Sequence, residues 1–349
     1  MPEIFLAIIA LMITAYIVLD GFDFGAGTVS LLFARAGDER RAIISAIGPF
    51  WDGNEVWLIA FGGMLMAAFP VALAAAFSGL YLAMFFIIWA LILRGMSVEL
   101  LMHMEDGVGR TLCTFVFGGA SAALSLLFGV ALGNVVRGMP LSGSEPLDLP
   151  LFTSFLPREP VGVLDTYTLL VGVLAVVALA WHGALYLSWK AEDPLRVRVR
   201  RAVRPLGIAT AVLYLASVFA TASFVPLSAR AMPGLVLAAA SFAFAFVMHG
   251  RSSAEAATSA GHDLRAFLGS CAFIAASLLG LAFARGGIVL ADVGHRADMT
   301  AAGALAPEGP LHPMLGISAF GLVLVTLYFA NLFRIHRGKL SPERDEEHD

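Results

Sequence analysis

The stretch IGPFWDGNEVWLIAFGGMLMAAFP, residues 47–70, places two acids and an amide directly before a long apolar run. From Leu58 onward it is typical of a membrane-spanning helix, whereas Asp52, Asn54 and Glu55 carry polar groups that are unfavourable in lipid. Polar residues inside a span are rare and indicate a functional site unless they are paired for structural reasons. The rest of the sequence must explain why a membrane helix begins this way.

The composition is that of a polytopic membrane protein. The 349 residues are 59% hydrophobic and 14% charged, with a mean hydropathy of +0.84, whereas soluble domains are roughly 45–50% apolar and about 25% charged. The net charge of −4 gives no indication of a nucleic-acid partner. Cys113 and Cys271 lie inside apolar runs, so they form neither a disulfide framework nor a cysteine metal site.

Nine segments are long and apolar enough to span a bilayer, which takes about 20 residues. The first lacks a basic n-region, so we interpret it as a helix of the mature protein. The second and third meet at Pro70 with almost no loop, which predicts an antiparallel hairpin. The predicted domain is one integral membrane unit, 1–340, before a charged, disordered tail, 341–349. The predicted spans are 4–34, 48–69, 71–98, 111–135, 162–187, 203–226, 232–250, 264–285 and 311–335.

The distribution of basic residues predicts the orientation. With the N-terminus outside, 17 of the 22 Lys and Arg residues fall on the inner side, as the positive-inside rule requires. We therefore expect the N-terminus outside and the C-terminus in the cytoplasm. The longest outer segments, 136–161 and 286–310, lack a helical apolar stripe. Any chemistry must then occur among the helices.

Two acid pairs are expected to face each other in the inner half of the membrane. Asp20 and Asp23 are three residues apart in DGFDFGAG, residues 20–27, and Asp52 and Glu55 repeat that spacing, so each pair shares a helix face. Arg94, near the inner end of the third span, is a counter-charge for Asp52 or Glu55, or a snorkelling residue. The acids are either a proton or cation path or structural caps that pair with arginines.

Other polar and aromatic residues have simpler interpretations. Trp51 suits a membrane interface, while Trp57 lies deeper. GGMLMAA, residues 62–68, is typical of a small-residue packing face. Of the histidines, only His182 lies near a position that a haem ligand would occupy, and we predict no cofactor or metal site in this chain.

Seven stretches together resemble subunit II of the cytochrome bd-type quinol oxidases, including the cyanide-insensitive oxidase branch. The pairing of DGFD with WDGNEVW on adjacent helices is the most specific part of the resemblance. The outer loop 286–310 departs from the family, since it lacks the expected proline-rich segment. The stretches are VLDGFDFGAG (18–27), IGPFWDGNEVWLIAFGGMLMAAFP (47–70), AAAFSGLYLAMFFIIWALILRG (74–95), WHGALYLSWK (181–190), TASFVP (221–226), HGRSSAEAATSAG (249–261) and NLFRIHRGKL (331–340).

The resemblance implies a fold and a role. It implies an all-α polytopic protein of two four-helix bundles plus one peripheral helix, in the bacterial cytoplasmic (inner) membrane. This subunit would be haem-free and would pair with a haem-bearing subunit I that carries haems b and d. The complex would oxidise quinol and reduce dioxygen to water. Small single-helix accessory subunits and a bound lipid or quinone are further partners, and the choice of ubiquinol or menaquinol stays open.

The resemblance also assigns residue roles. Asp23 and Trp51 match positions needed for haem integrity and assembly, and Asp52 matches an acid proposed to deliver protons to the subunit interface. Trp57 matches a residue near a proposed oxygen route, and Arg94 matches a basic position at the end of the third helix. Glu55 matches a position that also accepts Gln, which weakens its role in a relay.

Two other classes remain as hypotheses. An ion-coupled secondary transporter would use Asp20, Asp23, Asp52 and Glu55 for coupling, and the glycines of the first helix suit a broken helix. A structural assembly scaffold would use the same residues without any proton path.

Overall fold

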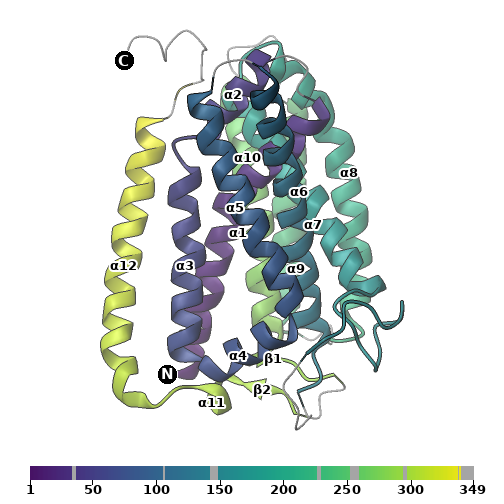
Figure 1. Cartoon of the computed structure of the whole chain (residues 1–349), viewed down its shortest axis with the longest axis vertical. Coiled ribbons are helices and arrows are strands. Elements are labelled where there is room, and N and C mark those ends of the chain that lie inside the picture. The colour runs from purple at the N-terminus through teal and green to yellow at the C-terminus, as the bar shows by residue number, and fades with distance from the viewer. Residues whose placement is uncertain are drawn as a thin grey trace.

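The computed structural model describes residues 1–33, 37–104, 107–141, 148–225, 229–251, 259–293, 297–336 and 338. Its dominant elements are long apolar helices that run roughly parallel to one another (Figure 1). The longest, α1 (Pro2–Phe33), has 32 residues, or about 48 Å at 1.5 Å per residue, which exceeds a hydrocarbon core of about 30 Å. The helix predicted over 4–34 thus corresponds to α1, which ends at the last described residue before the gap at 34–36.

The remaining helices follow in chain order, and most agree with the predicted spans to within a few residues. They are α2 (Gly37–Ile47), α3 (Trp51–Ala68), α4 (Pro70–Gly79), α5 (Tyr81–His103), α6 (Val108–Arg137), α7 (Thr166–Lys190), α8 (Leu195–Thr221), α9 (Met232–Arg251), α10 (Ser259–Ala284), α11 (Ala301–Ala304) and α12 (Glu308–Ile335). The strands β1 (Ile288–Leu290) and β2 (Met299–Thr300) pair antiparallel between α10 and α12.

The helices α3 and α5 run in opposite directions, as predicted, but the direct turn predicted at Pro70 is wrong, because α4 lies between them (Figure 1). The chain makes a bend of 117° between α3 and α4, and the third long helix, α5, begins only at Tyr81 rather than at residue 71. Phe69 leaves the helical conformation because the residue before a proline is pushed out of it, and Pro70 then starts α4. The apolar run through residues 71–98 concealed a separate ten-residue helix.

The number of membrane spans depends on this bend. Among the described residues, eight helices are long and apolar enough to cross a membrane, and nine if the bent pair of α3 and α4 is one span. The predicted count of nine, the two four-helix bundles and the sidedness of the termini therefore stay predictions. The single membrane domain also stays a prediction, and the tail 341–349 lies outside the described residues.

The two ends of the molecule are distinct. The N-terminus lies at the end that carries α4, β1, β2 and α11, which we call the β1 end (Figure 1). The C-terminal end of α12 lies at the opposite end, beside α2, which we call the α2 end. The helix α12 stands at the margin of the molecule (Figure 1). It contacts α3 through Phe329 and Trp57, and Phe333 stacks on Phe50, the residue before α3, with centroids 4.7 Å apart.

The helix α1 is central, since it packs against α3, α6, α7 and α10. Its glycines permit this. A Cβ atom on Gly25 would lie 1.9 Å from the carbonyl oxygen of Leu179, and one on Gly183 would lie 2.3 Å from the Gly25 backbone. A Cβ atom on Gly118 of α6 would lie 2.8 Å from the Gly27 carbonyl oxygen. Small residues let membrane helices approach closely, so the glycine faces of α1 meet α6 and α7.

Two neighbouring glycines of α6 test this packing. We expect Gly118→Ala to destabilise the protein by about 1–3 kcal/mol, because the added methyl group overpacks the α1–α6 contact. Gly119→Ala is the matched control, since its Cβ atom would meet nothing within 4 Å among the described residues. The measurement is the thermal unfolding midpoint in detergent. Equal midpoints for the two variants would contradict the proposed contact.

Candidate functional site

The structure brings one arginine and three acids together at the centre of α1, α3 and α5. The Arg94 side chain is fully buried, and its Nη1 and Nη2 donate to the two carboxylate oxygens of Asp20 at 3.0 and 2.5 Å. Nη1 also donates to Glu55 Oε1 at 3.1 Å, and Nη2 lies 3.7 Å from Asp23 Oδ2. We call Asp20, Asp23, Glu55 and Arg94 the Arg94 cluster.

Helix spacing explains why these groups meet. Asp20 and Asp23 are three residues apart on α1, so they project from one face toward α3 and α5, while the glycines of α1 face α6 and α7. The Phe24 ring lies beneath the guanidinium, with a distance of 4.6 Å from the Arg94 Cζ atom to the ring centroid. The cluster therefore depends on the same packing that places α1 at the centre.

Asn54 is a member of this site to which the sequence assigned no role. Its Nδ2 atom donates to Asp23 Oδ2 at 2.8 Å and to the carbonyl oxygen of Leu19 at 3.1 Å, which joins α3 to α1. The sequence could have indicated this role, because an amide inside a predicted span needs a hydrogen-bond partner. Within the described residues, Asn54 Oδ1, Asp23 Oδ1 and Arg94 Nε have no hydrogen-bond partner. The site therefore has two oxygen atoms that can accept a hydrogen bond and one N–H group that can donate one.

Asp52 does not join the cluster. It is exposed on the outward face of α3, together with Val56 and Ile59, whose side chains are 47% and 73% exposed. Arg94 therefore pairs with Asp20 and Glu55, and the alternative that it pairs with Asp52 is wrong for this chain as described. The side chain of Glu55 lies between the buried cluster and the exposed face of α3, since it is 29% exposed.

The tryptophans occupy two different positions. Trp51 is partly buried and packs on α5, where a Cβ atom on Gly95 would lie 3.5 Å from its ring. Trp57 is buried against α12, with its ring centroid 6.3 Å from that of Phe329. The first two residues of the predicted packing face at 62–68 contact no neighbouring helix closely, because Cβ atoms on Gly62 and Gly63 would meet nothing within 4 Å in the described chain.

The one histidine considered as a haem ligand has its nitrogens engaged. His182 is fully buried, its Nδ1 lies 2.7 Å from Ser270 Oγ, and its Nε2 lies 3.0 Å from the carbonyl oxygen of Val18. The Phe267 ring stacks on the imidazole with centroids 5.0 Å apart. The surroundings of His182 therefore suit helix packing and do not fit axial ligation of a haem. Across the described residues, no group of three or more His, Cys, Asp or Glu side chains could hold a metal ion.

Further buried ion pairs lie toward the two ends of the helices. Near the β1 end, Arg137 pairs with Asp165 and donates to the Asn134 side chain at 2.7 Å. Asp165 also caps the N-terminus of α7. Near the α2 end, Asp263 of α10 pairs with Arg196 and Arg200 of α8. These pairs join neighbouring helices, and we assign them a structural role.

Taken together, the fold and the buried charges define a polytopic α-helical membrane protein with an ionisable cluster in its interior. The chain belongs to the family described as cytochrome bd terminal oxidase subunit II, whose model matches residues 1–336. The resemblance inferred from the sequence motifs is confirmed.

Known relatives and a solved structure agree with this family. The chain is 34% identical over 207 residues to cytochrome bd-I ubiquinol oxidase subunit 2 of Escherichia coli (strain K12), covering 59% of this chain and 53% of the relative. It is 28% identical over 199 residues to cytochrome bd ubiquinol oxidase subunit 2 of Bacillus subtilis (strain 168), covering 57% and 56%. The chain thus aligns with about half the length of these relatives.

The fold is similar to that of the bd oxidase from Geobacillus thermodenitrificans. The TM-score is 0.73 at 18% sequence identity, and the match covers 96% of this chain and 98% of that chain. At this identity the match shows the fold alone.

Removing the arginine tests whether the cluster holds the three helices together. We expect Arg94→Gln to destabilise the protein by about 3–5 kcal/mol, because it leaves buried carboxylates without their counter-charge. Adding Asp20→Asn should recover part of that loss, since it removes one of the unpaired charges. The measurement is the thermal unfolding midpoint in detergent.

Arg334→Gln is the control for loss of a positive charge, because Arg334 is exposed on α12. Its effect is expected to stay within about 0.5 kcal/mol. An Arg94→Gln protein as stable as the parent would show that the cluster does not hold α1, α3 and α5 together.

Proposed function

We propose that this protein is the haem-free subunit II of a bd-type quinol:dioxygen oxidoreductase in the bacterial cytoplasmic membrane. Its role is to support a haem-bearing subunit I and to conduct protons from the cytoplasmic side for the reduction of dioxygen to water. The observation that carries the proposal is the Arg94 cluster, in which three acids on two helices surround one buried guanidinium. Family membership supports the same role.

The proposed proton path begins at Asp52 and continues through Glu55 to Asp23 and Asp20. Asp52 and Glu55 are separated by one turn of α3, or about 4.5 Å along its axis, so a proton can pass between them through water. Glu55 contacts Arg94, which also contacts both aspartates. Three carboxyl groups around one guanidinium leave a surplus of negative charge, and binding a proton relieves that surplus in a low-dielectric interior.

Subunit I is proposed to cover the exposed face of α3 and α5. An acid such as Asp52 is unfavourable next to lipid, yet it lies among exposed apolar side chains. A partner that covers this face would shield Asp52 and receive protons from it. The large exposed side chains on the two helices include Val56, Ile59, Met66, Phe85, Phe86, Trp89 and Met96.

Trp51, Trp57 and Arg94 are proposed to support this arrangement. Trp51 packs at the α3–α5 contact and Trp57 at the α3–α12 contact. The two residues therefore fix the orientation of α3 and hence of Asp52. We also propose an oxygen route beside Trp57, and this proposal rests on the family resemblance alone. Haems b and d are assigned to subunit I and quinol is the proposed substrate of the complex.

The transporter hypothesis is not favoured. Three of the four acids that would couple ions are already engaged: Arg94 binds Asp20 and Glu55, and Asn54 binds Asp23. The family match points to an oxidase subunit instead. The scaffold hypothesis keeps the same family but assigns no proton path to Asp52, so a substitution at that residue separates the two.

Co-purification tests the class of protein. A tagged copy of this chain, isolated from its native membrane in mild detergent, is expected to bring a second integral membrane subunit and the optical absorption of haems b and d. The measurement is the reduced-minus-oxidised spectrum of the purified sample. A colourless chain that purified alone and moved a solute in liposomes would contradict the oxidase proposal and favour the transporter.

Substitution of Asp52 tests the proton path. Asp52→Asn is expected to slow oxygen consumption by about tenfold or more, because positioned proton-transfer groups contribute roughly 10²- to 10⁴-fold to rates. Haem content should stay near that of the parent, since Asp52 is exposed and lies outside the Arg94 cluster. The measurements are oxygen uptake with excess quinol and haem absorbance per complex.

The control is Glu99→Gln, which removes an exposed acid from α5 that lies beside His103. It is expected to leave oxygen uptake unchanged. Loss of haem in Asp52→Asn would show a structural role and support the scaffold, whereas unchanged activity would remove Asp52 from the mechanism.

A further inference from the structure

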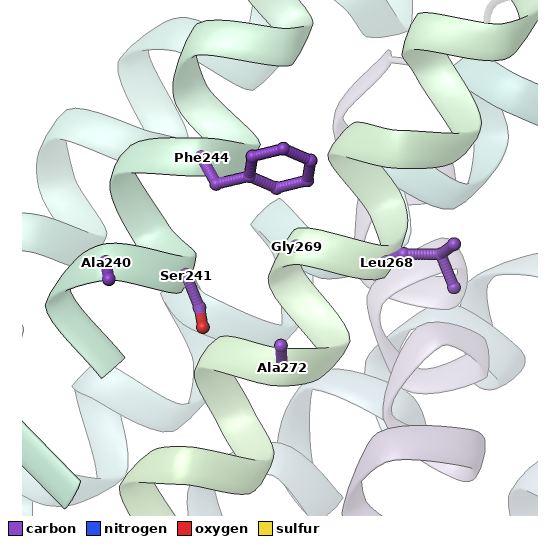
Figure 2. Close-up of a pocket in the computed structure, with 6 residues that line it drawn as sticks. All are labelled: Ala240, Ser241, Phe244, Leu268, Gly269 and Ala272. Atoms are coloured by element: carbon purple, nitrogen blue, oxygen red, sulfur yellow. The ribbon is translucent and has the colours of Figure 1, made fainter. Parts of the chain in front are cut away.

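A groove on the outer surface between α9 and α10 lies apart from the Arg94 cluster. It has a volume of about 290 Å³ and is lined by Ala240, Ser241, Phe244, Leu268, Gly269 and Ala272. Figure 2 shows the Phe244 ring extending from α9 toward α10, above Ser241 and Ala272. Since its lining residues all belong to α9 and α10, the groove shares no residue with the proposed proton path.

Close helix packing on either side of the groove explains its shape. A Cβ atom on Gly234 would lie 2.5 Å from the Cα atom of Gly280, and one on Gly269 would lie 2.8 Å from the Cβ atom of Ala245. The helices α9 and α10 thus pack closely at two positions along their length. Between these positions the side chains of Ala240, Ser241 and Ala272 are small, so the surface is hollowed there. The result is an open and mostly apolar groove.

Exposed arginines lie just beyond one end of this groove. Arg265 precedes Leu268 by one turn of α10, which places it about 4.5 Å closer to the α2 end. Arg251 follows Phe244 by two turns of α9, or about 10 Å in the same direction. Both side chains are exposed. Residues spaced by one or two turns share a helix face, so both arginines continue the line of the groove.

The neighbouring helix adds to this positive charge. Arg204 of α8 is exposed and lies one turn before Gly207, a position where a Cβ atom would contact Phe246 of α9 at 3.3 Å. The nearby acid Asp263 is buried and already pairs with Arg196 and Arg200. Among the described residues of α8, α9 and α10, the exposed arginines therefore present positive charge at the α2 end, directly beyond an apolar groove.

We propose that this groove binds one anionic phospholipid, with an acyl chain between α9 and α10 and its phosphate at Arg251 and Arg265. An acyl chain suits an apolar groove lined mostly by small side chains, and a phosphate accepts hydrogen bonds from arginine. Basic residues at the membrane surface attract anionic lipids. A zwitterionic lipid or an isoprenoid quinone would fill the groove without using the arginines. The site uses none of the residues of the proposed proton path, and only the choice of the complex as the sample rests on the proposed function.

Native mass spectrometry of the purified complex tests the site. The complex is stripped of bound lipid in detergent and then exposed to phosphatidylglycerol or phosphatidylcholine with identical acyl chains. We expect one phosphatidylglycerol to be retained, with an affinity about tenfold or more above that of phosphatidylcholine. Ala272→Trp, which fills the groove, and the double variant Arg251→Gln with Arg265→Gln should each abolish the retained lipid.

Matched controls separate the site from general effects on the complex. Ala239→Trp adds the same bulk at an exposed position of α9 outside the groove, and Arg334→Gln removes an exposed positive charge from α12. Both controls should retain phosphatidylglycerol like the parent. Subunit composition and spectrum report the state of the complex, so a lost lipid is distinguished from a lost assembly.

Three results would overturn the proposal. The first is equal retention of the two lipids by the parent. The second is retention of phosphatidylglycerol by the double arginine variant. The third is a quinone or a small helical subunit that stays bound in the parent and is lost from Ala272→Trp.

Discussion

The buried pairing of Arg94 with Asp20 is the interaction on which the rest of the site depends. The two hydrogen bonds of 3.0 and 2.5 Å join α5 to α1, and Glu55 brings in α3 through the same guanidinium. Charges without partners are very unfavourable in a low-dielectric interior, so each group of the cluster restricts where the others can lie. The cluster thereby fixes three helices in register.

The glycine faces of α1 make that pairing geometrically accessible. Close contact at Gly25 and Gly183 draws α1 against α7, and contact at Gly27 and Gly118 draws it against α6. The opposite face of α1 then presents Asp20 and Asp23 toward α3 and α5. One helix therefore combines backbone packing on one side with charge pairing on the other, and the site cannot be separated from the core of the fold.

The structure divides the acids of the opening stretch into two groups. Glu55 turns toward Arg94, whereas Asp52, one turn away, lies on an exposed apolar face. This division suits a subunit whose ionisable interior is connected to a surface that a second subunit covers. The groove between α9 and α10 is formed by other helices, so the two proposed interactions of this chain with its surroundings are separate in space.

The sequence by itself determined the helical membrane class, the family and the polar residues that matter, because an apolar span and a buried charge have strong physical signatures in local sequence. It also predicted most helix positions, but not the break at residues 69–81, since α4 is as apolar as the helix that follows. Only the tertiary structure decided that Arg94 pairs with Asp20, that Asn54 completes the site and that Asp52 is excluded. The physical reason is that residues on one helix face can be found from their spacing, whereas the choice among several acids for one arginine depends on how the helices are rotated and packed.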